Sequence, residues 1–270
     1  MSGDGITGNG MGDGGMTKLK GTEGGTALVT GASSGIGAAV VRQLTGSGRK
    51  VVAVARRADR LAALADETGC RVETLDMRDF PRAVAFTSEL KPDVLVNNAG
   101  SGHGFLGVQS ASDEDLTVAV ETNVLAPLFL LKAALPAMVA AQRGHIVNIG
   151  SIAGLYPIVS AVYGGTKGAI HLTSQNLRHE LKGTGVRVTE IAPGRVATEF
   201  YDASNIPEET AAKIKDTGIE ELTPDDVASA VLFALDAPAR MNVSLIELTP
   251  TEQTPGGIAI VPAGGIDSGG

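Results

Sequence analysis

The stretch ALVTGASSGIGAAVVRQL, residues 27–44, decides the fold of this chain. Its first residues are apolar and strand-forming, the chain turns at Gly31, and the apolar spacing from Ile36 onward is that of a short helix. Strand, tight glycine turn and helix form the setting in which a glycine-rich loop binds phosphate, because unpaired N–H groups and the positive end of the helix dipole face the anion. The spacing G-x-x-x-G-x-G differs from the commoner G-x-G-x-x-G, so an ordinary glycine turn without a ligand is the alternative.

Apolar strands alternate with helix-length segments along the rest of the chain. Strands that are apolar throughout and are separated by helices indicate a parallel sheet covered on both faces. The sequence therefore predicts an α/β fold, a doubly wound, three-layer α/β/α sandwich. Expected strands lie at 27–31, 50–56, 71–77, 93–100, 146–149, 187–193 and 243–249, and expected helices at 36–44, 58–67, 79–90, 112–142, 163–182 and 224–235.

Two segments depart from this regular pattern. In the long helix 112–142, Ser112 is the expected N-cap and Pro127 the expected site of a kink or a break. Residues 195–222 are polar, contain Pro207 and Gly218, and lack a steady period. We expect this second segment to be irregular.

Length and composition indicate one domain with two tails. A chain of 270 residues with 43% apolar content can form one large α/β domain, which we place at 25–250. Residues 1–24 are Gly-rich with almost nothing to bury, so we expect a disordered tail. Residues 251–270 form a C-terminal tail. The net charge of −8 argues against nucleic acid and against an anionic membrane as partners, because both need clustered Lys and Arg.

The remaining composition points to the cytoplasm. The single cysteine, Cys70, can form no internal disulfide and reads as a small buried hydrophobe. We find no run of about 18 apolar residues, the length that spans a bilayer. The N-terminus lacks the apolar core of a signal peptide. No cluster of Cys, His and carboxylates has ligand spacing, so we predict no metal site.

A second constellation follows the strand at 146–149. Ser151 stands at the end of that strand, and Tyr163 and Lys167 are four residues apart, which on a helix puts both side chains on one face. A phenol normally loses its proton near pH 10, and a neighbouring ammonium favours the phenolate. We therefore expect Lys167 to lower the pKa of Tyr163 and make it a general acid/base.

The choice of dinucleotide is read at the end of the second strand. A carboxylate there would bind the ribose 2′-hydroxyl of NAD, whereas arginine accommodates the 2′-phosphate of NADP. This chain has Arg56 and Arg57 at that position, which favours NADP(H). The alternative is a solvated helix start. Asp76, at the end of the third strand, either faces the adenine or caps the helix that follows.

Five motifs stand in a fixed order: TGASSGIG (30–37), NNAG (97–100), Asn123, the set Ser151, Tyr163 and Lys167, and APG (192–194) followed by Thr198. In this order they resemble the classical short-chain dehydrogenase/reductase family, and the resemblance runs from Thr26 to Thr249. It implies a Rossmann-type sheet of about seven strands. It also implies a catalytic set of Asn123, Ser151, Tyr163 and Lys167.

The resemblance assigns roles to these residues. Tyr163 protonates a carbonyl oxygen as hydride arrives from the nicotinamide, and Ser151 hydrogen-bonds the same oxygen. Lys167 depresses the Tyr163 pKa and holds the ribose, and Asn123 anchors a water that relays protons. The implied NADP(H) contacts are Gly31, Ser33, Ser34, Gly35, Ile36, Gly37, Arg56, Arg57, Asp76, Met77, Asn98, Ala99, Gly100, Tyr163, Lys167, Pro193, Gly194, Val196 and Thr198.

The sequence departs from the family pattern in two ways. Tyr163 lies twelve residues after Ser151, one fewer than is usual, and Ser151 is preferred over Ser160 because it stands at the strand end. The ending ELTPTEQTPGG replaces the more usual finish. With RVTEIAPGRVATEF and LTPDDVASAVLFAL it looks like the subgroup acting on 3-hydroxy acids such as serine and allo-threonine.

The substrate site is expected in the loops 101–109, 152–160 and 195–218. Ser151 and Tyr163 contact the substrate, Tyr156 forms a wall of its pocket, and Arg195 with His103 pairs with a substrate carboxylate. His103 could equally be a histidine of a mobile loop with no role in the site. The resemblance implies that helices 112–142 and 163–182 pack against their copies in a homodimer or homotetramer.

Two other functions remain open at this point. One is a 3-oxoacyl thioester reductase, which would need a basic patch for an acidic carrier protein. The other is a dinucleotide sensor without turnover, for which a perturbed phenol has no use.

Overall fold

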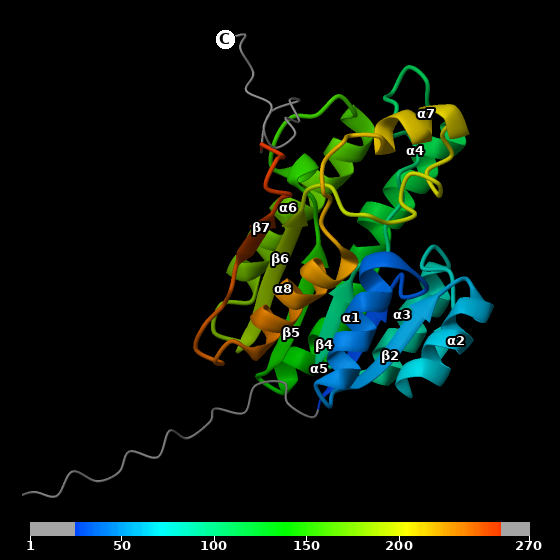
Figure 1. The fold of residues 1–270 in the computed structure, drawn as a ribbon. Helices are drawn as coiled ribbons and strands as arrows, with labels where there is room; N and C mark the ends of the chain where they lie inside the picture. Colours follow the sequence, from blue (N-terminus) through cyan, green and yellow to red (C-terminus); the bar gives the residue numbers. More distant parts are fainter. Residues whose placement is uncertain (1–24, 255–270) are drawn as a thin grey trace, which may run out of the picture.

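The computed structural model describes residues 25–254, in which a parallel sheet lies between two layers of helices (Figure 1). The seven strands run in the order β3-β2-β1-β4-β5-β6-β7. The chain moves outward from β1 to β3 and then returns to β4 beside β1, which creates a crevice at the carboxyl ends of these two strands. The strands are β1 (Thr26–Thr30), β2 (Lys50–Ala55), β3 (Arg71–Thr74), β4 (Val94–Asn97), β5 (Gly144–Ile149), β6 (Val186–Pro193) and β7 (Leu245–Leu248).

Two hydrophobic clusters hold the layers together. One cluster joins the sheet to α1, α2 and α8, and the other joins its opposite face to α3, α5 and α6. The predicted doubly wound sandwich is therefore confirmed. The helices are α1 (Gly35–Gly46), α2 (Ala58–Thr68), α3 (Phe80–Leu90), α4 (Asp113–Val120), α5 (Ala126–Ala140), α6 (Ala161–Glu180), α7 (Glu208–Lys215) and α8 (Pro224–Asp236).

The long helix expected at 112–142 is divided by a π-helical turn. Ser112 caps α4 as predicted, and the π turn Glu121–Leu125 connects α4 to α5. Pro127 lies in the first turn of α5, just after the π turn. A proline ring clashes with the carbonyl four residues earlier, here that of Asn123, and a widened turn relieves this clash. The break therefore falls at Asn123.

The helical run Asp113–Ala140 also corrects one sequence expectation. With a mean hydropathy of 1.7 over its most apolar window, it is long and apolar enough to cross a membrane by length and composition alone. Its inward side chains Leu130, Leu131 and Met138 are buried against the sheet. The run is thus a core helix of the sandwich.

Two other segments differ from expectation. β3 ends at Thr74, three residues earlier than predicted, because Leu75 and Met77 turn into the core while Asp76 bonds Arg78. The segment 195–222 contains one short helix, α7. This segment and the start of α4 lie beyond the carboxyl edge of the sheet (Figure 1). The predicted tail 1–24 and residues 255–270 lie outside the described residues.

Arg187, a buried residue of β6, caps the C-terminal end of α8 by hydrogen-bonding its last carbonyl groups. Its guanidinium donates to the carbonyl oxygens of Ala234 and Leu235 at 3.3 and 3.2 Å and to that of Ala237 at 3.1 Å. The Arg187 side chain is buried, and this burial lowers the pKa of its guanidinium. Carbonyls at a helix end otherwise lack partners.

We therefore expect Arg187→Met to lower the free energy of unfolding by about 2–3 kcal/mol, because several buried carbonyls lose a charged donor. Urea unfolding followed by circular dichroism measures the change. Arg240→Met, at an exposed position nearby, serves as the control and should stay near the parent. Equal stabilities for the two variants would contradict this role.

Candidate active site

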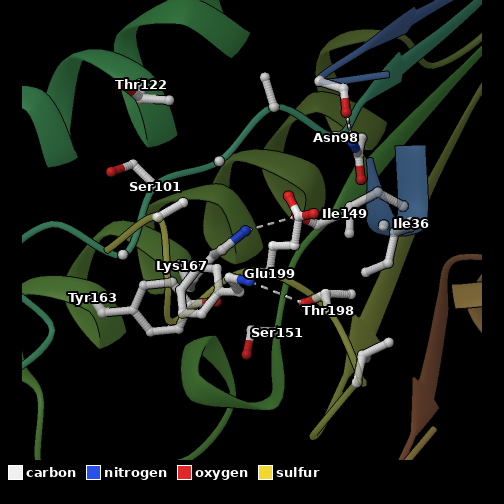
Figure 2. Close-up of a pocket in the computed structure, with 18 of the residues that line it drawn as sticks. Ile36, Asn98, Ser101, Thr122, Ile149, Ser151, Tyr163, Lys167, Thr198 and Glu199 are labelled. Carbon is white, nitrogen blue, oxygen red and sulfur yellow. Dashed lines mark hydrogen bonds between the residues drawn. The ribbon is translucent and has the colours of Figure 1, made fainter. Parts of the chain in front are cut away.

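A cavity of about 550 Å³ opens at the carboxyl edge of the sheet. It is lined mainly by the segments that follow β1 to β6, with Tyr163 and Lys167 of α6 (Figure 2). Gln253 also lines it. All predicted cofactor residues except Gly37 lie at its lining: Gly31, Ser33, Ser34, Gly35, Ile36, Arg56, Arg57, Asp76, Met77, Asn98, Ala99, Gly100, Tyr163, Lys167, Pro193, Gly194, Val196 and Thr198. The three loops expected to hold substrate also contribute residues.

The glycine turn is held against the exit of β4. The Asn98 side-chain amide donates to the carbonyls of Thr30 and Gly31 at 2.9 and 3.2 Å. Gly31 has a φ of +66°, and a Cβ at Gly37 would lie 2.4 Å from the Gly31 oxygen. Gly37 is therefore needed for close packing of helix and turn, and it does not line the cavity.

The start of α1 suits an anionic ligand. Ser34 occupies the N-cap without a side-chain capping bond, and the first turn has no acidic residue, so its N–H groups and dipole favour a negative charge. Arg57 lies beside it, with Nε 3.0 Å from the Ser33 hydroxyl and Nη2 2.6 Å from that of Ser34. These groups fit a dinucleotide that carries an extra phosphate.

Asp76 lies at the same end of the cavity but does not cap the next helix. Its carboxylate pairs with Arg78 at 3.0 Å, whereas Asp79 caps α3 by accepting from the Arg82 N–H. The capping alternative for Asp76 is therefore wrong.

Ser151, Tyr163 and Lys167 meet at one side of the cavity, away from Asn98 and Ile36 (Figure 2). Lys167 donates to the Ile149 carbonyl at 2.9 Å, and its ammonium lies 5.9 Å from the centre of the Tyr163 ring. Ser160 instead caps α6 by accepting from the Tyr163 N–H. This arrangement supports the choice of Ser151 over Ser160.

Burial controls the proton affinities of this group. Burial lowers the pKa of Lys167 to about 8, although the charge of Glu190 opposes the shift. Burial raises the pKa of Tyr163, although a hydrogen bond with Ser151 opposes it. The expected depression of the Tyr163 pKa is thus wrong in this structure, because desolvation outweighs the hydrogen bond with Ser151 and Lys167 adds no lowering of its own. The phenol keeps its proton at neutral pH and is a proton donor.

An aromatic wall that the sequence analysis missed accounts for this desolvation. The rings of Phe105 and Phe200 lie 5.6 and 5.2 Å from that of Tyr163, measured between centroids. Tyr201 packs against both phenylalanines at 5.4 and 5.3 Å. These residues come from two irregular loops, so no periodic pattern could have pointed to them.

Asn123 is buried beside the cavity and does not line it. Its Oδ1 accepts from the Ser101 N–H at 2.7 Å, and its Nδ2 donates to the Ser101 carbonyl and the Thr166 hydroxyl at 2.8 and 3.0 Å. The side chain therefore fixes the loop after β4 against α6.

Of the residues expected to contact substrate, Arg195 lines the cavity and Tyr156 does not. Tyr156 does not line the cavity, because its hydroxyl turns outward and donates to Glu247 at 3.2 Å. Arg195 does line it, with Nε 2.7 Å from Glu221. Gln253 accepts from the Arg195 N–H at 2.9 Å, so contacts with the site continue beyond the domain boundary placed at 250.

His103 also lines the cavity, and Asp115 holds it. The Asp115 carboxylate lies 2.8 Å from the His103 Nδ1 and accepts from Asn205 at 3.0 Å, and it also completes the cap with Ser112. Bonds from Asn205, Ser112 and His103 lower the pKa of Asp115. Asp115 thereby joins the loop after β4 to the segment after β6.

Among the residues described, 25–254, no three His, Cys, Asp or Glu side chains group as a metal site would require.

We expect Asp115→Asn to lower the free energy of unfolding by about 2 kcal/mol and to speed hydrogen exchange in 101–107 and 199–206. A lowered folded pKa stabilises the protein above the ordinary carboxyl pKa and loses this effect as pH falls, so the difference should be full at pH 7 and shrink in acid. Asp113→Asn, in the same helical turn, is the control. Unchanged exchange in both loops would contradict the proposed link.

Comparison with known proteins agrees with this geometry. A model of the short chain dehydrogenase family matches residues 25–209. The NADP-dependent 3-hydroxy acid dehydrogenase YdfG of Salmonella typhi is 39% identical over 242 residues, 86% of this chain and 98% of the relative. Serine 3-dehydrogenase of Agrobacterium fabrum is 35% identical over 244 residues, 87% and 98% of the two chains.

A solved structure titled the closed form of serine dehydrogenase complexed with NADP+ has a TM-score of 0.81 and 37% identity, covering 87% of this chain and 98% of that one. The seven-stranded parallel sheet is the one that the sequence motifs predicted. The chain therefore belongs to the short-chain dehydrogenase family.

Proposed function

We propose that this protein is an NADP(H)-dependent oxidoreductase that interconverts a secondary alcohol and a ketone, with a 3-hydroxy acid as its alcohol substrate. The observation that carries the proposal is the meeting of Ser151, Tyr163 and Lys167 in one cavity with an anion-binding helix start and two arginines. The names of the relatives, an NADP-dependent 3-hydroxy acid dehydrogenase and a serine 3-dehydrogenase, support the cofactor and the substrate class.

When bound, the nicotinamide supplies or accepts the hydride at the carbonyl carbon. Tyr163, protonated at neutral pH, donates its proton to the carbonyl oxygen and is left as a phenolate; in the reverse direction this phenolate takes the proton from the alcohol. Ser151 donates a hydrogen bond to the same oxygen, where negative charge develops. Lys167 is held by the Ile149 carbonyl and provides positive charge beside the phenol. Asn123 positions the Ser101 loop.

The cofactor contacts divide by chemistry. We assign the pyrophosphate to the start of α1, the 2′-phosphate to Arg56 and Arg57, and the adenine side to Asp76 and Met77. The NNAG loop, Lys167 and the APG segment up to Thr198 remain for the nicotinamide and its ribose.

For the substrate carboxylate we propose Arg195, supported by His103. Arg195 lines the cavity but already pairs with Glu221 and donates to the Ile214 carbonyl at 2.6 Å, so substrate would share or displace the Glu221 contact. A carrier-protein reductase is less well supported. Lys213 and Lys215, its required basic patch, pair with Glu209 and Asp202.

We further propose a cytoplasmic homotetramer. Apolar residues are exposed on two separate surfaces: Val120, Leu125, Leu128, Val139 and Leu172 on α4 to α6, and Phe233, Met241 and Leu245 at α8 and β7. If each of these surfaces pairs with its own copy about a two-fold axis, the two interfaces together give a closed tetramer.

Tyr163→Phe should lower turnover by about a hundredfold or more, because the proton donor is removed. NADPH binding, measured by titration, should persist because the ring remains. Tyr156→Phe removes the same hydroxyl outside the cavity and is the matched control. Parental turnover by Tyr163→Phe would refute the acid/base assignment.

A pair of variants tests the role of Arg195. If its guanidinium binds the substrate carboxylate, Arg195→Ala should raise KM severalfold for a hydroxy acid and leave a neutral alcohol unaffected. Glu221→Gln keeps the guanidinium but removes its competitor, so it should lower the same KM. If both variants raise KM for both kinds of substrate, Arg195 serves only to hold the 214–221 segment.

A further inference from the structure

The segment after β6 crosses over the glycine turn and is tied to it by charge. A Cβ at Gly35 would lie 3.1 Å from the Thr198 methyl group, so the two segments are in close approach. The next residue, Glu199, lines the cavity. Its carboxylate lies 3.0 Å from Arg57 and 2.7 Å from Arg60. The glutamate thus reaches the arginine that stands beside the start of α1.

Arg57 is shared by two kinds of partner. One side of its guanidinium contacts the hydroxyls of Ser33 and Ser34, and its Nη1 donates to Glu199. A carboxylate and a phosphate monoester both present negative charge and oxygen acceptors to a guanidinium, so they can occupy the same donor groups. Both arginines lower the pKa of Glu199, so the carboxylate is charged at neutral pH.

We propose that Glu199 is a specificity-determining residue that competes with the 2′-phosphate of the dinucleotide for Arg57. A phosphorylated dinucleotide must displace Glu199 from this guanidinium, whereas an unphosphorylated one leaves the ion pair intact. Glu199 therefore weakens binding of the phosphorylated form alone and narrows the preference for NADP(H) over NAD(H). This inference rests on the assignment of Arg57 in the proposed function.

Arg60 can hold Glu199 when a phosphate displaces it from Arg57. It contacts both carboxylate oxygens of Glu199, at 2.8 and 2.7 Å, and it does not line the cavity. A glutamate displaced from Arg57 therefore keeps a charge partner outside the cavity. Because Glu199 and both arginines are partly exposed, the competition is a modest effect.

The test compares two small probes, adenosine 2′,5′-bisphosphate and adenosine 5′-diphosphate, by calorimetric titration of the full chain. Glu199→Gln should tighten binding of the bisphosphate about two- to fivefold, the range for an exposed ion pair, and leave the diphosphate unchanged. The gain should shrink at high salt. Glu208→Gln, an exposed position on the same segment, is the matched control and should change neither affinity.

A double-mutant cycle separates this inference from the proposed cofactor site. Arg57→Ala should weaken the bisphosphate selectively, and in that background Glu199→Gln should have no further effect. If Arg57→Ala weakens the bisphosphate but Glu199→Gln changes neither probe, or changes both equally, the competition is refuted while the cofactor site stands. If Arg57→Ala has no effect on the bisphosphate, the assignment of Arg57 itself fails.

Discussion

The hydrogen bonds from the Asn98 amide to the carbonyls of Thr30 and Gly31 are the contact on which the site depends. They join the exits of β1 and β4, the two strands between which the chain reverses direction in the sheet. Thr30 adds to this contact, since its hydroxyl accepts from the N–H groups of Asn98 and Ala99. The crevice that holds the cavity is thus fixed by backbone and buried side chains, before any loop closes over it.

Around this fixed crevice, charge is arranged in pairs. Arg195 faces Glu221, His103 faces Asp115, and Arg57 faces Glu199. Each of these three basic side chains therefore already has a carboxylate partner within the site. Ligand binding at such positions is an exchange of anions, so selectivity depends on the carboxylates as much as on the cations.

Burial shifts the pKa values of Tyr163 and Lys167 in opposite directions. The aromatic wall removes water from the phenol and keeps it protonated, while the same desolvation disfavours the ammonium of Lys167. The charge of Glu190, on β6, raises the pKa of Lys167 and so opposes this desolvation. The Glu190 carboxylate is hydrogen-bonded to His171 at 2.8 Å. The balance at the site therefore depends on α6, on β6 and on the segments that follow β4 and β6.

Much of the fold and of the site could be predicted from local pattern. Continuous apolar strands and glycine spacing gave the sheet and the turn, and the four-residue spacing of Tyr163 and Lys167 gave their common face. Pro127 predicted a kink or a break in the long helix, and the structure has the π turn just before it. By contrast, the pKa of Tyr163 was predicted in the wrong direction, because a spacing rule contains the neighbouring charge but not the rings of Phe105 and Phe200.

The sequence by itself determined the order of strands and helices along the chain, the glycine turn and the choice of Ser151, Tyr163 and Lys167 as candidate catalytic side chains, because these depend on residues close together in the chain. Only the tertiary structure decided that Tyr156 faces away, that Gly37 packs against the glycine turn, and that Gln253 and Glu199 reach the cavity. Such contacts join residues separated by long stretches of chain, and the loops that make them have no period from which their direction could be read.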